Sequence, residues 1–422
     1  MNPSSNFGIL PLFFGSLLAL SSHGPAQESI AAQKPVTPAG LVLTWRNDPA
    51  TTMVIDWHRR ESEQDEAAVI RVREAGGAAW QDHPAARRPF PHGKGWIDRV
   101  ELEKLRPATS YEFQTGGGGR VYSFMTMPSE LKQPLTFAAG GDVMHARQWM
   151  ETVNRVVMKR DPAFVLWVGD LAYADGIPGN VGRWENFLAA MCDTLITPQG
   201  RVVPVIVGIG NHEIRGGYHN DRIRGPEDRK RLAPFFYDLF AFPGQPGYGV
   251  LDFGRYLSLV VGDSGHSNPI DGKQTNWLER TLKARQDFTH VIPVYHVPAW
   301  PSAREFDNPQ SVQLREHWVP LFEKYGISLA MENHDHTLKR TVPIHDGKRD
   351  DARGIIYLGD GAWGVDTREV KKAGETWYLE KSAGARHAWI ITLDRNGKKA
   401  EALAEDGSTL DVVELPLTPG RR

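Results

Sequence analysis

The feature that most constrains this chain is a layout that occurs five times along the sequence. In each case a run of apolar, β-favouring residues ends in a side chain that can bind a metal ion. The runs lead into Asp142, Asp170, Asn211, His296 and the pair His334 and His336. Such runs are typical of buried parallel strands, and ligands of open α/β sheets bind outside the carboxyl ends of the strands. The sequence therefore predicts a metal site where these strand ends meet.

Helical patterns separate the apolar runs. From about Gln133, apolar residues recur at helical spacing over residues 148–160, 184–195, 230–240, 276–285 and 312–325. Alternating strands and helices predict a largely parallel sheet with helices on its faces, in a unit over residues 133–415. After His336 only strand-like segments follow, at 341–344, 354–358 and 388–393, and we expect this tail to close a second sheet.

Residues 35–128 have a different pattern. Short runs with period-two alternation, such as Leu41–Trp45 and Met53–Trp57, are separated by turn residues. This pattern predicts an all-β sandwich, and Tyr111 stands where a tyrosine corner is expected. The segment resembles a fibronectin type III-like domain. It contains no cluster of histidines and carboxylates at metal-binding spacing, so we assign it no chemistry.

The N-terminus predicts export. The run from Phe7 to Leu20 is apolar over about 14 residues, shorter than the ~20 that a membrane-spanning helix needs, and small residues follow it. We therefore expect a signal peptide over residues 1–27, a secreted or periplasmic protein, and no stable membrane insertion after its removal. No Lys or Arg precedes the run, and the alternative is a loosely anchored tail.

Charge and cysteine content exclude other classes. The formal net charge of −2 favours neither nucleic acid nor an acidic membrane surface as a partner. Cys192 is the single cysteine, which excludes an intrachain disulfide and a cysteine-based zinc site. The sequence does not indicate the oligomeric state.

The donors at the strand ends fit a pair of cations. The Asp170 carboxylate has two oxygens and can bridge two metals, whereas Asn211 offers only a neutral amide oxygen. His334 and His336 are two positions apart and would share one face of a strand. On a loop that leaves a strand, both can reach neighbouring metals. Two cations about 3.5–4 Å apart are used for phosphoester cleavage.

These blocks resemble a known family. The segments Gly-Asp, Gly-Asp-Leu-Ala-Tyr, Gly-Asn-His-Glu, Tyr-His and Asn-His-Asp-His are similar to the five ordered blocks of purple acid phosphatases, in the calcineurin-like metallophosphoesterase superfamily. A fibronectin-like sandwich ahead of the catalytic domain also resembles their two-domain members. The resemblance implies an α/β four-layer catalytic domain with two mixed sheets. It covers nearly the whole mature chain.

The resemblance also implies a ligand set and an activity. The first metal would be Fe(III), and the second Fe(II), Zn or Mn. The expected ligands are Asp142, Asp170, Tyr173 and His336 for the first metal and Asp170, Asn211, His296 and His334 for the second. The expected reaction is hydrolysis of small phosphate monoesters, with a metal-bound hydroxide as nucleophile. His212 would stabilise the transition state or protonate the leaving alkoxide.

Tyr173 distinguishes this chain from relatives whose first block is Asp-x-His. Here Met144 stands at the histidine position and His145 is one residue out of step. The first metal therefore needs another donor, and Tyr173, close behind Asp170, can supply a phenolate oxygen suited to iron(III). The alternative is a colourless dimanganese or dizinc centre with Tyr173 packed nearby as a neutral phenol.

Two further departures concern the surroundings of the site. Asn333 stands where the family usually has glycine, which costs backbone freedom. Plant members carry a His-His pair downstream of the block containing His296, and this chain has Arg304 and Glu305 in that neighbourhood. We therefore take Arg304 as a candidate phosphate contact.

Two other functions remain open on the sequence alone: a phosphodiesterase on the same scaffold, and a non-enzymatic extracellular binding protein with a vestigial site. Around the blocks, we expect Asp175 to shape its loop and Glu213 to orient His212 or face water. Residues 359–361 are expected to line the site. The other histidines are predicted to lie on the surface or to be bonded locally: His145, His219, His266, His317, His345 and His387.

Overall fold

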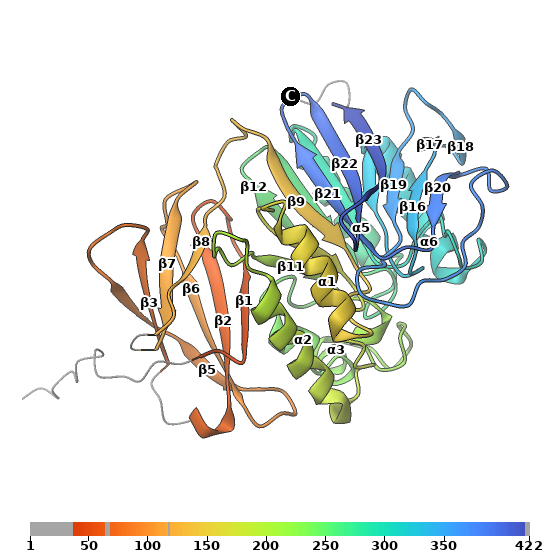
Figure 1. The fold of residues 1–422 in the computed structure, drawn as a ribbon. Helices are drawn as coiled ribbons and strands as arrows, with labels where there is room; N and C mark the ends of the chain where they lie inside the picture. The colour runs from red at the N-terminus through yellow and green to blue at the C-terminus, as the bar shows by residue number, and fades with distance from the viewer. Residues whose placement is uncertain (1–36, 64–67, 117–118, 418–422) are drawn as a thin grey trace, which may run out of the picture.

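The computed structural model describes residues 37–63, 68–116 and 119–417. The predicted signal peptide, residues 1–27, lies outside the described residues. None of the helices among the described residues combines the length and the apolar composition that a membrane-spanning segment requires. Figure 1 shows a β-sandwich, coloured red to orange, beside a larger α/β unit.

The N-terminal unit is a sandwich of two four-stranded antiparallel sheets. One sheet has the order β1 (Gly40–Thr44), β2 (Met53–Arg59), β6 (Trp96–Leu102) and β5 (Ala86–Pro89). The other has the order β4 (Gln81–Pro84), β3 (Val69–Glu74), β7 (Ser110–Thr115) and β8 (Tyr122–Met125). The predicted tyrosine corner is present, because the Tyr111 hydroxyl accepts a hydrogen bond from the Arg106 amide at 2.9 Å. The sequence pattern did not predict strands β4 and β5, because both are mostly exposed edge strands without apolar alternation.

The second unit contains two mixed sheets. The six-stranded sheet has the order β11 (Val205–Gly208), β10 (Val165–Val168), β9 (Leu135–Gly140), β21 (His387–Leu393), β22 (Gly397–Ala404) and β23 (Thr409–Pro416). The seven-stranded sheet has the order β12 (Gly249–Phe253), β13 (Leu257–Val261), β14 (His290–Val294), β15 (Leu329–Met331), β19 (Ile356–Gly359), β16 (Leu338–Thr341) and β20 (Leu379–Ala383). The short strands β17 (Ile344–His345) and β18 (Lys348–Arg349) pair with each other. The tail therefore does not only close the second sheet, because β21 to β23 extend the first sheet beside β9.

Alternation along the strands builds four layers. In β10, Val165 and Trp167 pack in a core shared with α1 (Arg147–Met158) and α2 (Val181–Thr194). Leu166 and Val168 face the opposite way, into the core shared with β13 of the other sheet. On the far side, Val260 of β13 packs with α5 (Lys273–Lys283), α6 (Pro309–His317) and α7 (Val319–Lys324). The order helix, sheet, sheet, helix confirms the predicted fold class.

Two predicted helices are interrupted, each near a proline. The segment 230–240 forms α3 (Pro226–Leu232) and α4 (Phe236–Leu239), with Ala233 out of helical conformation before Pro234. The segment 312–325 divides between α6 and α7, and Pro320 occupies the first turn of α7. Proline lacks an amide hydrogen and restricts the residue before it, so a helix tolerates it only near its start. The apolar spacing thus locates both helical segments but does not mark the break within each.

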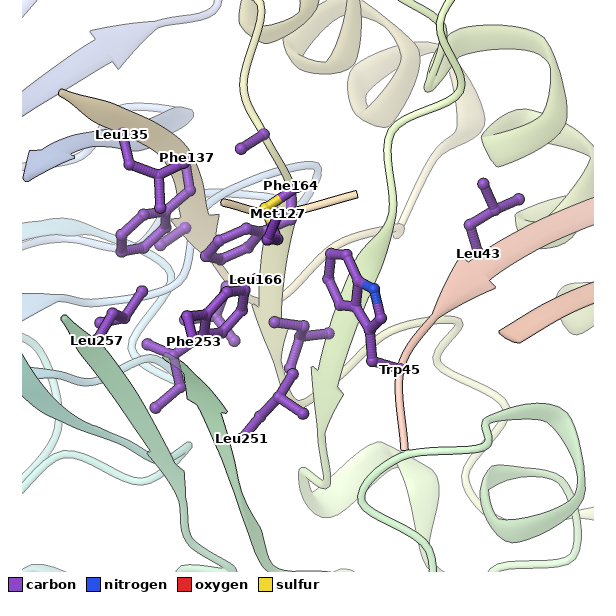
Figure 2. Close-up of a cluster of buried hydrophobic side chains, with 14 of the residues drawn as sticks. Leu43, Trp45, Met127, Leu135, Phe137, Phe164, Leu166, Leu251, Phe253 and Leu257 are labelled. Carbon is purple, nitrogen blue, oxygen red and sulfur yellow. The ribbon is translucent and has the colours of Figure 1, made fainter. Parts of the chain in front are cut away.

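The sandwich is joined to the α/β unit by an apolar core (Figure 2). Trp45 at the end of β1 is fully buried, and its ring lies 6.2 Å from that of Phe164 and 5.8 Å from that of Phe253. Leu43 and Met127 of the sandwich side belong to the same buried cluster as Leu135 at the start of β9. Because these side chains form one continuous core, the α/β unit depends on the sandwich for part of its stability.

Trp45→Ala is therefore expected to lower the free energy of unfolding by about 3–5 kcal/mol, since it removes a fully buried aromatic ring. Urea unfolding of the variant and the wild-type protein measures the difference. Trp80→Ala is the matched control. The Trp80 ring is half-buried with Arg73 stacked over it at 4.3 Å, and its loss is expected to cost about 1 kcal/mol or less. Equal costs for the two variants would contradict a shared core at Trp45.

Candidate metal centre

The predicted donors meet where the carboxyl ends of both sheets converge. Asp142, Asp170 and Asn211 follow β9, β10 and β11 of the six-stranded sheet. His296 and the His334–His336 pair follow β14 and β15 of the seven-stranded sheet. Parallel pairing of β9, β10 and β11, and of β14 and β15, brings these ends to one edge, as predicted.

The donors form two groups that share one carboxylate. Donor atoms of Asp170, His296 and His334 lie within 4.8 Å of one another, and so do those of Asp142, Asp170 and His336. All five side chains are buried. Since only Asp170 belongs to both groups, its two oxygens are placed to face two neighbouring cations.

Left-handed backbone conformations aim these side chains inward. Five of the predicted donors have positive φ angles, a conformation that residues other than glycine seldom adopt: Asp142 (55°), Asp170 (54°), Tyr173 (54°), His334 (81°) and His336 (58°). Each such residue costs of order 1–3 kcal/mol, and such strain clusters at functional sites. The sharp turns at His334 and His336, on either side of Asp335, direct both imidazoles toward the same centre.

Gly361 shows how tightly the loops close on the site. A Cβ atom at this position would lie 1.8 Å from Asp142 Oδ2, and its φ is +68°. Only glycine fits there, so the loop 359–361 lines the site as predicted. Its Asp360 points away and is buried against the Lys339 ammonium at 2.8 Å.

The histidine tautomers show that the donor set fits cations. His296 Nδ1 lies 3.0 Å from the Val168 carbonyl, which only accepts, so Nδ1 carries the hydrogen. In the neutral ring, Nε2 then presents a lone pair to Asp170 Oδ2 at 3.1 Å and Asn211 Oδ1 at 3.2 Å. Three acceptors facing one another need a positive charge between them. Burial lowers the pKa of His296, but Asp170 and Asp142 outweigh it and raise the pKa to about 9, which shows how strongly the site attracts positive charge.

The group that contains Asp142 and His336 has the same arrangement. His336 Nδ1 donates to the Asp366 carbonyl at 3.0 Å, so the neutral ring turns the Nε2 lone pair toward Asp142 Oδ1, 3.1 Å away. The Tyr173 hydroxyl lies 3.1 Å from both Asp142 Oδ1 and His336 Nε2. Burial, with Asp142 and Asp170 adding to it, raises the pKa of Tyr173 well above its usual value. Tyr173 is therefore a phenol unless a strongly charged cation binds its oxygen.

His334 directs its two ring nitrogens to different partners. Nδ1 lies 3.1 Å from His296 Nε2, and Nε2 lies 3.3 Å from the Tyr218 hydroxyl. Burial, together with His296 and Arg304, lowers the pKa of His334 well below its usual value, so the ring is neutral and able to bind a metal. Tyr218 was not predicted, because a tyrosine on a loop carries no motif of its own.

His212 lies beside the two groups without belonging to either. Its backbone amide donates to Asp170 Oδ1 at 2.8 Å, and its Nε2 lies 3.9 Å from Asp170 Oδ2. Its Nδ1 forms a short hydrogen bond with the Asp175 carboxylate. About a third of the His212 side chain is exposed, and its ring lies 4.3 Å from the Tyr173 ring. Asp175 therefore does more than shape its loop, because it holds the His212 ring.

The expectation for Glu213 was wrong. Glu213 is buried, and its carboxylate accepts hydrogen bonds from the backbone amides of Asp170, Leu171 and Gly210 at 2.7–2.8 Å. Burial, with Asp170 next in size, raises the pKa of Glu213 to about 7. Glu213 neither faces water nor orients His212; it ties the Asp170 loop to the loop that carries Asn211.

Arg304 lies at the rim on the His334 side. Its guanidinium is 3.3 Å from the carboxylate of Asp335, the residue between the two histidines, and about a third of its side chain is exposed. Asp335 also accepts the amides of Ala303 and Arg304 at 2.7 and 3.1 Å. The charge of Arg304 is near enough to help lower the pKa of His334. The structure thus brings Arg304 to the site.

The structure also modifies the expectations for His145 and Asn333. His145 is not merely a surface histidine, because its ring packs 4.2 Å from that of Tyr173 and 5.3 Å from that of His336. Asn333 is not among the residues with positive φ, so the backbone there does not need glycine. Its side-chain amide donates to the Tyr295 carbonyl at 3.3 Å.

Comparison with known families agrees with this architecture. Residues 38–126 match the family model described as the purple acid phosphatase N-terminal domain. Residues 135–338, which carry every predicted metal donor, match the model described as calcineurin-like phosphoesterase. The chain belongs to the purple acid phosphatase-like members of the calcineurin-like metallophosphoesterases.

Curated relatives agree with this membership. Purple acid phosphatase 21 of Arabidopsis thaliana is 29% identical over 280 residues, which is 64% of this chain and 60% of that protein. Acid phosphatase type 7 of Mus musculus is 27% identical over 364 residues, which is 79% of this chain and 77% of that protein. The chain spans about 60% of the length of three of the Arabidopsis relatives that it matches, purple acid phosphatase 21 among them.

Two solved structures share the fold. A purple acid phosphatase from yellow lupin (Lupinus luteus) seeds superposes with a TM-score of 0.75 at 19% identity, over 91% of this chain and 74% of that chain. The structure of PhoD superposes with a TM-score of 0.64 at 12% identity, over 91% of this chain and 90% of that chain. Both matches extend over the sandwich as well as the α/β unit, since each covers 91% of the residues.

Proposed function

We propose that this protein hydrolyses phosphate monoesters at a binuclear metal centre. The observation that carries the proposal is the position of Asp170, the single carboxylate shared by two groups of buried donors. Asp142, Asp170, Tyr173 and His336 would hold the first cation, and Asp170, Asn211, His296 and His334 the second. Two such cations, when bound, supply Lewis-acid activation of the phosphoryl group and of the attacking water.

The protein's own side chains would position the substrate and move the proton. Arg304 at the rim offers a guanidinium to the phosphate oxygens, for which its planar fork is suited. His212 carries its Nδ1 hydrogen toward Asp175, so its Nε2 is free to hold a proton on the side of Asp170. A histidine held in one tautomer beside the reacting group is suited to protonate the departing alkoxide.

The proposal that the first cation is iron(III) rests on the position of Tyr173. Its hydroxyl oxygen lies 3.1 Å from both Asp142 Oδ1 and His336 Nε2. At these distances one cation can contact all three atoms. The second cation would be Fe(II), Zn or Mn, all of which accept imidazole and oxygen ligands.

Tyr173→Phe is expected to abolish the visible absorption of the iron-loaded, oxidised protein, because a phenolate bound to iron(III) transfers charge to the metal. The variant should retain its fold, since only the hydroxyl is removed. Absorption spectra of both proteins, recorded with circular dichroism as the control for folding, provide the measurement. An iron-loaded wild-type protein without a visible band, or a variant that keeps the band, would contradict the phenolate assignment.

Turnover of 4-nitrophenyl phosphate and bis(4-nitrophenyl) phosphate by metal-loaded protein tests the reaction. We expect the monoester to be the better substrate. Preference for the bis-ester would replace the proposal by a phosphodiesterase. Turnover of neither would favour a binding protein with a vestigial site. We also propose export through residues 1–27, which N-terminal sequencing of the mature secreted protein would test.

A further inference from the structure

A cavity lies next to Tyr218, the residue whose hydroxyl contacts the metal donor His334. It has a volume of about 540 Å³ and is formed mainly by the loops that follow β11 and β13, at the same edge of the sheets as the metal donors. The residues that matter for its chemistry are His219, Arg224, Arg229, Tyr248, Asn268 and Lys273.

The cavity is strongly basic. Arg224, Arg229 and Lys273 line it, and Asp271 is the one carboxylate among the lining residues. Within residues 37–63, 68–116 and 119–417, no carboxylate approaches any of the three cationic groups within ion-pair distance. The Asp228 carboxylate, which accepts the Arg224 backbone amide, is instead paired with Arg231 at 2.9 Å.

Arg229 is the most informative of the three. It is half-buried, and its guanidinium donates to Gln245 Oε1 at 2.9 Å and Asn268 Oδ1 at 3.3 Å, both neutral acceptors. Asn268 is in turn fixed by Asp263, which accepts from its side-chain amide at 2.9 Å. These neutral acceptors do not offset the positive charge of the half-buried Arg229 guanidinium. An anion bound in the cavity would offset it.

Two loop segments contact the metal donors and also line the cavity. The Tyr218 hydroxyl contacts His334 on the metal side, and the next residue, His219, lines the cavity. On the neighbouring loop, the His266 ring lies 5.4 Å from that of His296, and Asn268, two residues on, lines the cavity. A molecule that occupies both the metal centre and the cavity would have to extend past residues 218–219.

We propose that this cavity binds a second phosphate group of the substrate, so that the preferred substrates carry two or more phosphates. The inference rests on the proposed phosphatase function and specifies its substrate class. Arginine binds phosphate through paired, charge-assisted hydrogen bonds, and lysine adds a mobile positive charge. Arg224 and Arg229 can supply the paired hydrogen bonds, and Lys273 the mobile charge. Among the described residues, none of the three has a carboxylate partner.

The test compares two sugar phosphates that differ by one phosphate group. KM and kcat are measured for fructose 6-phosphate and fructose 1,6-bisphosphate with the wild-type protein and the double variant Arg224→Gln/Lys273→Gln. These residues are exposed. The control Arg222→Gln/Lys283→Gln removes the same two charges from exposed residues that do not line the cavity.

We expect the wild-type protein to favour the bisphosphate. Its advantage in KM over the monophosphate should shrink about tenfold in Arg224→Gln/Lys273→Gln, because charge-assisted contacts to the second phosphate are lost. The control should keep the wild-type ratio. An unchanged ratio in the cavity variant, or an equal change in the control, would overturn the inference.

Failure of the proposed function would give a different result. If the metal-loaded wild-type protein hydrolyses neither sugar phosphate nor 4-nitrophenyl phosphate, the phosphatase assignment fails. The sugar phosphates then remain intact in solution, and titration calorimetry compares their binding by the same three proteins. Tighter binding of the bisphosphate that is lost only in the cavity variant supports a second phosphate site, and equal binding by all three proteins overturns it.

Discussion

Asp170→Ala is expected to lose both metal ions together and to lower phosphatase turnover by on the order of 10³-fold or more. Asp170 is the only member of both donor groups, and its Oδ2 lies 3.1 Å from His296 Nε2. Removing the shared carboxylate leaves each group with too few anionic oxygens to hold a cation. Metal content per chain and turnover of 4-nitrophenyl phosphate are the two readouts.

Asp366→Ala is the control for this experiment. The Asp366 carboxylate lies near the site, 3.5 Å from His145, but belongs to neither donor group, and 75% of the side chain is exposed. It fixes His336 through its backbone carbonyl, which the substitution keeps. The control should therefore retain both metals. An Asp170→Ala protein with full metal content would show that Asp170 does not bridge.

His212→Ala is expected to keep both metals and to lower kcat by about 10²–10⁴-fold, the usual contribution of general acid–base catalysis. The effect should depend on the leaving group. Nitrophenolate leaves without a proton, whereas an alkoxide needs one, so the loss should be larger for an alkyl phosphate than for 4-nitrophenyl phosphate. A purely structural His212 would lower both rates alike.

Asp175→Asn is the matched variant, because it removes the carboxylate that holds His212 Nδ1 and leaves the imidazole in place. Its loss of rate should be smaller than that of His212→Ala and should show the same dependence on the leaving group. Unchanged turnover in His212→Ala, or release of a metal, would rule out the proposed role of His212.

The sequence predicted the donors because their signal is local. Each apolar run ends in its donor, and the parallel order of β9, β10 and β11 follows from strand–helix alternation. That Asp170, and not Asp142, is the shared carboxylate was implied by the resemblance to purple acid phosphatases, because any carboxylate has two oxygens. The fold class followed from the change between period-two and helical spacing near residue 130.

The supporting residues could not be predicted in the same way. Glu213 acts through backbone amides of a loop more than 40 residues away, and Tyr218 meets His334 across 116 residues. The Glu213 contacts depend on how the loops after β10 and β11 fold together, and the Tyr218 contact on how the two sheets are placed. No local pattern records either. The edge strands β4 and β5 and the breaks at Pro234 and Pro320 were missed because tertiary context or a single proline outweighed the periodic signal.

Anomalous diffraction from crystals of the metal-loaded protein tests the binuclear centre most directly. We predict two metal peaks on either side of the Asp170 carboxylate. The first peak should lie among Asp142, Tyr173 and His336, with the absorption edge of iron, and the second among Asn211, His296 and His334. A single peak, or two peaks of which Asp170 contacts only one, would contradict the binuclear assignment.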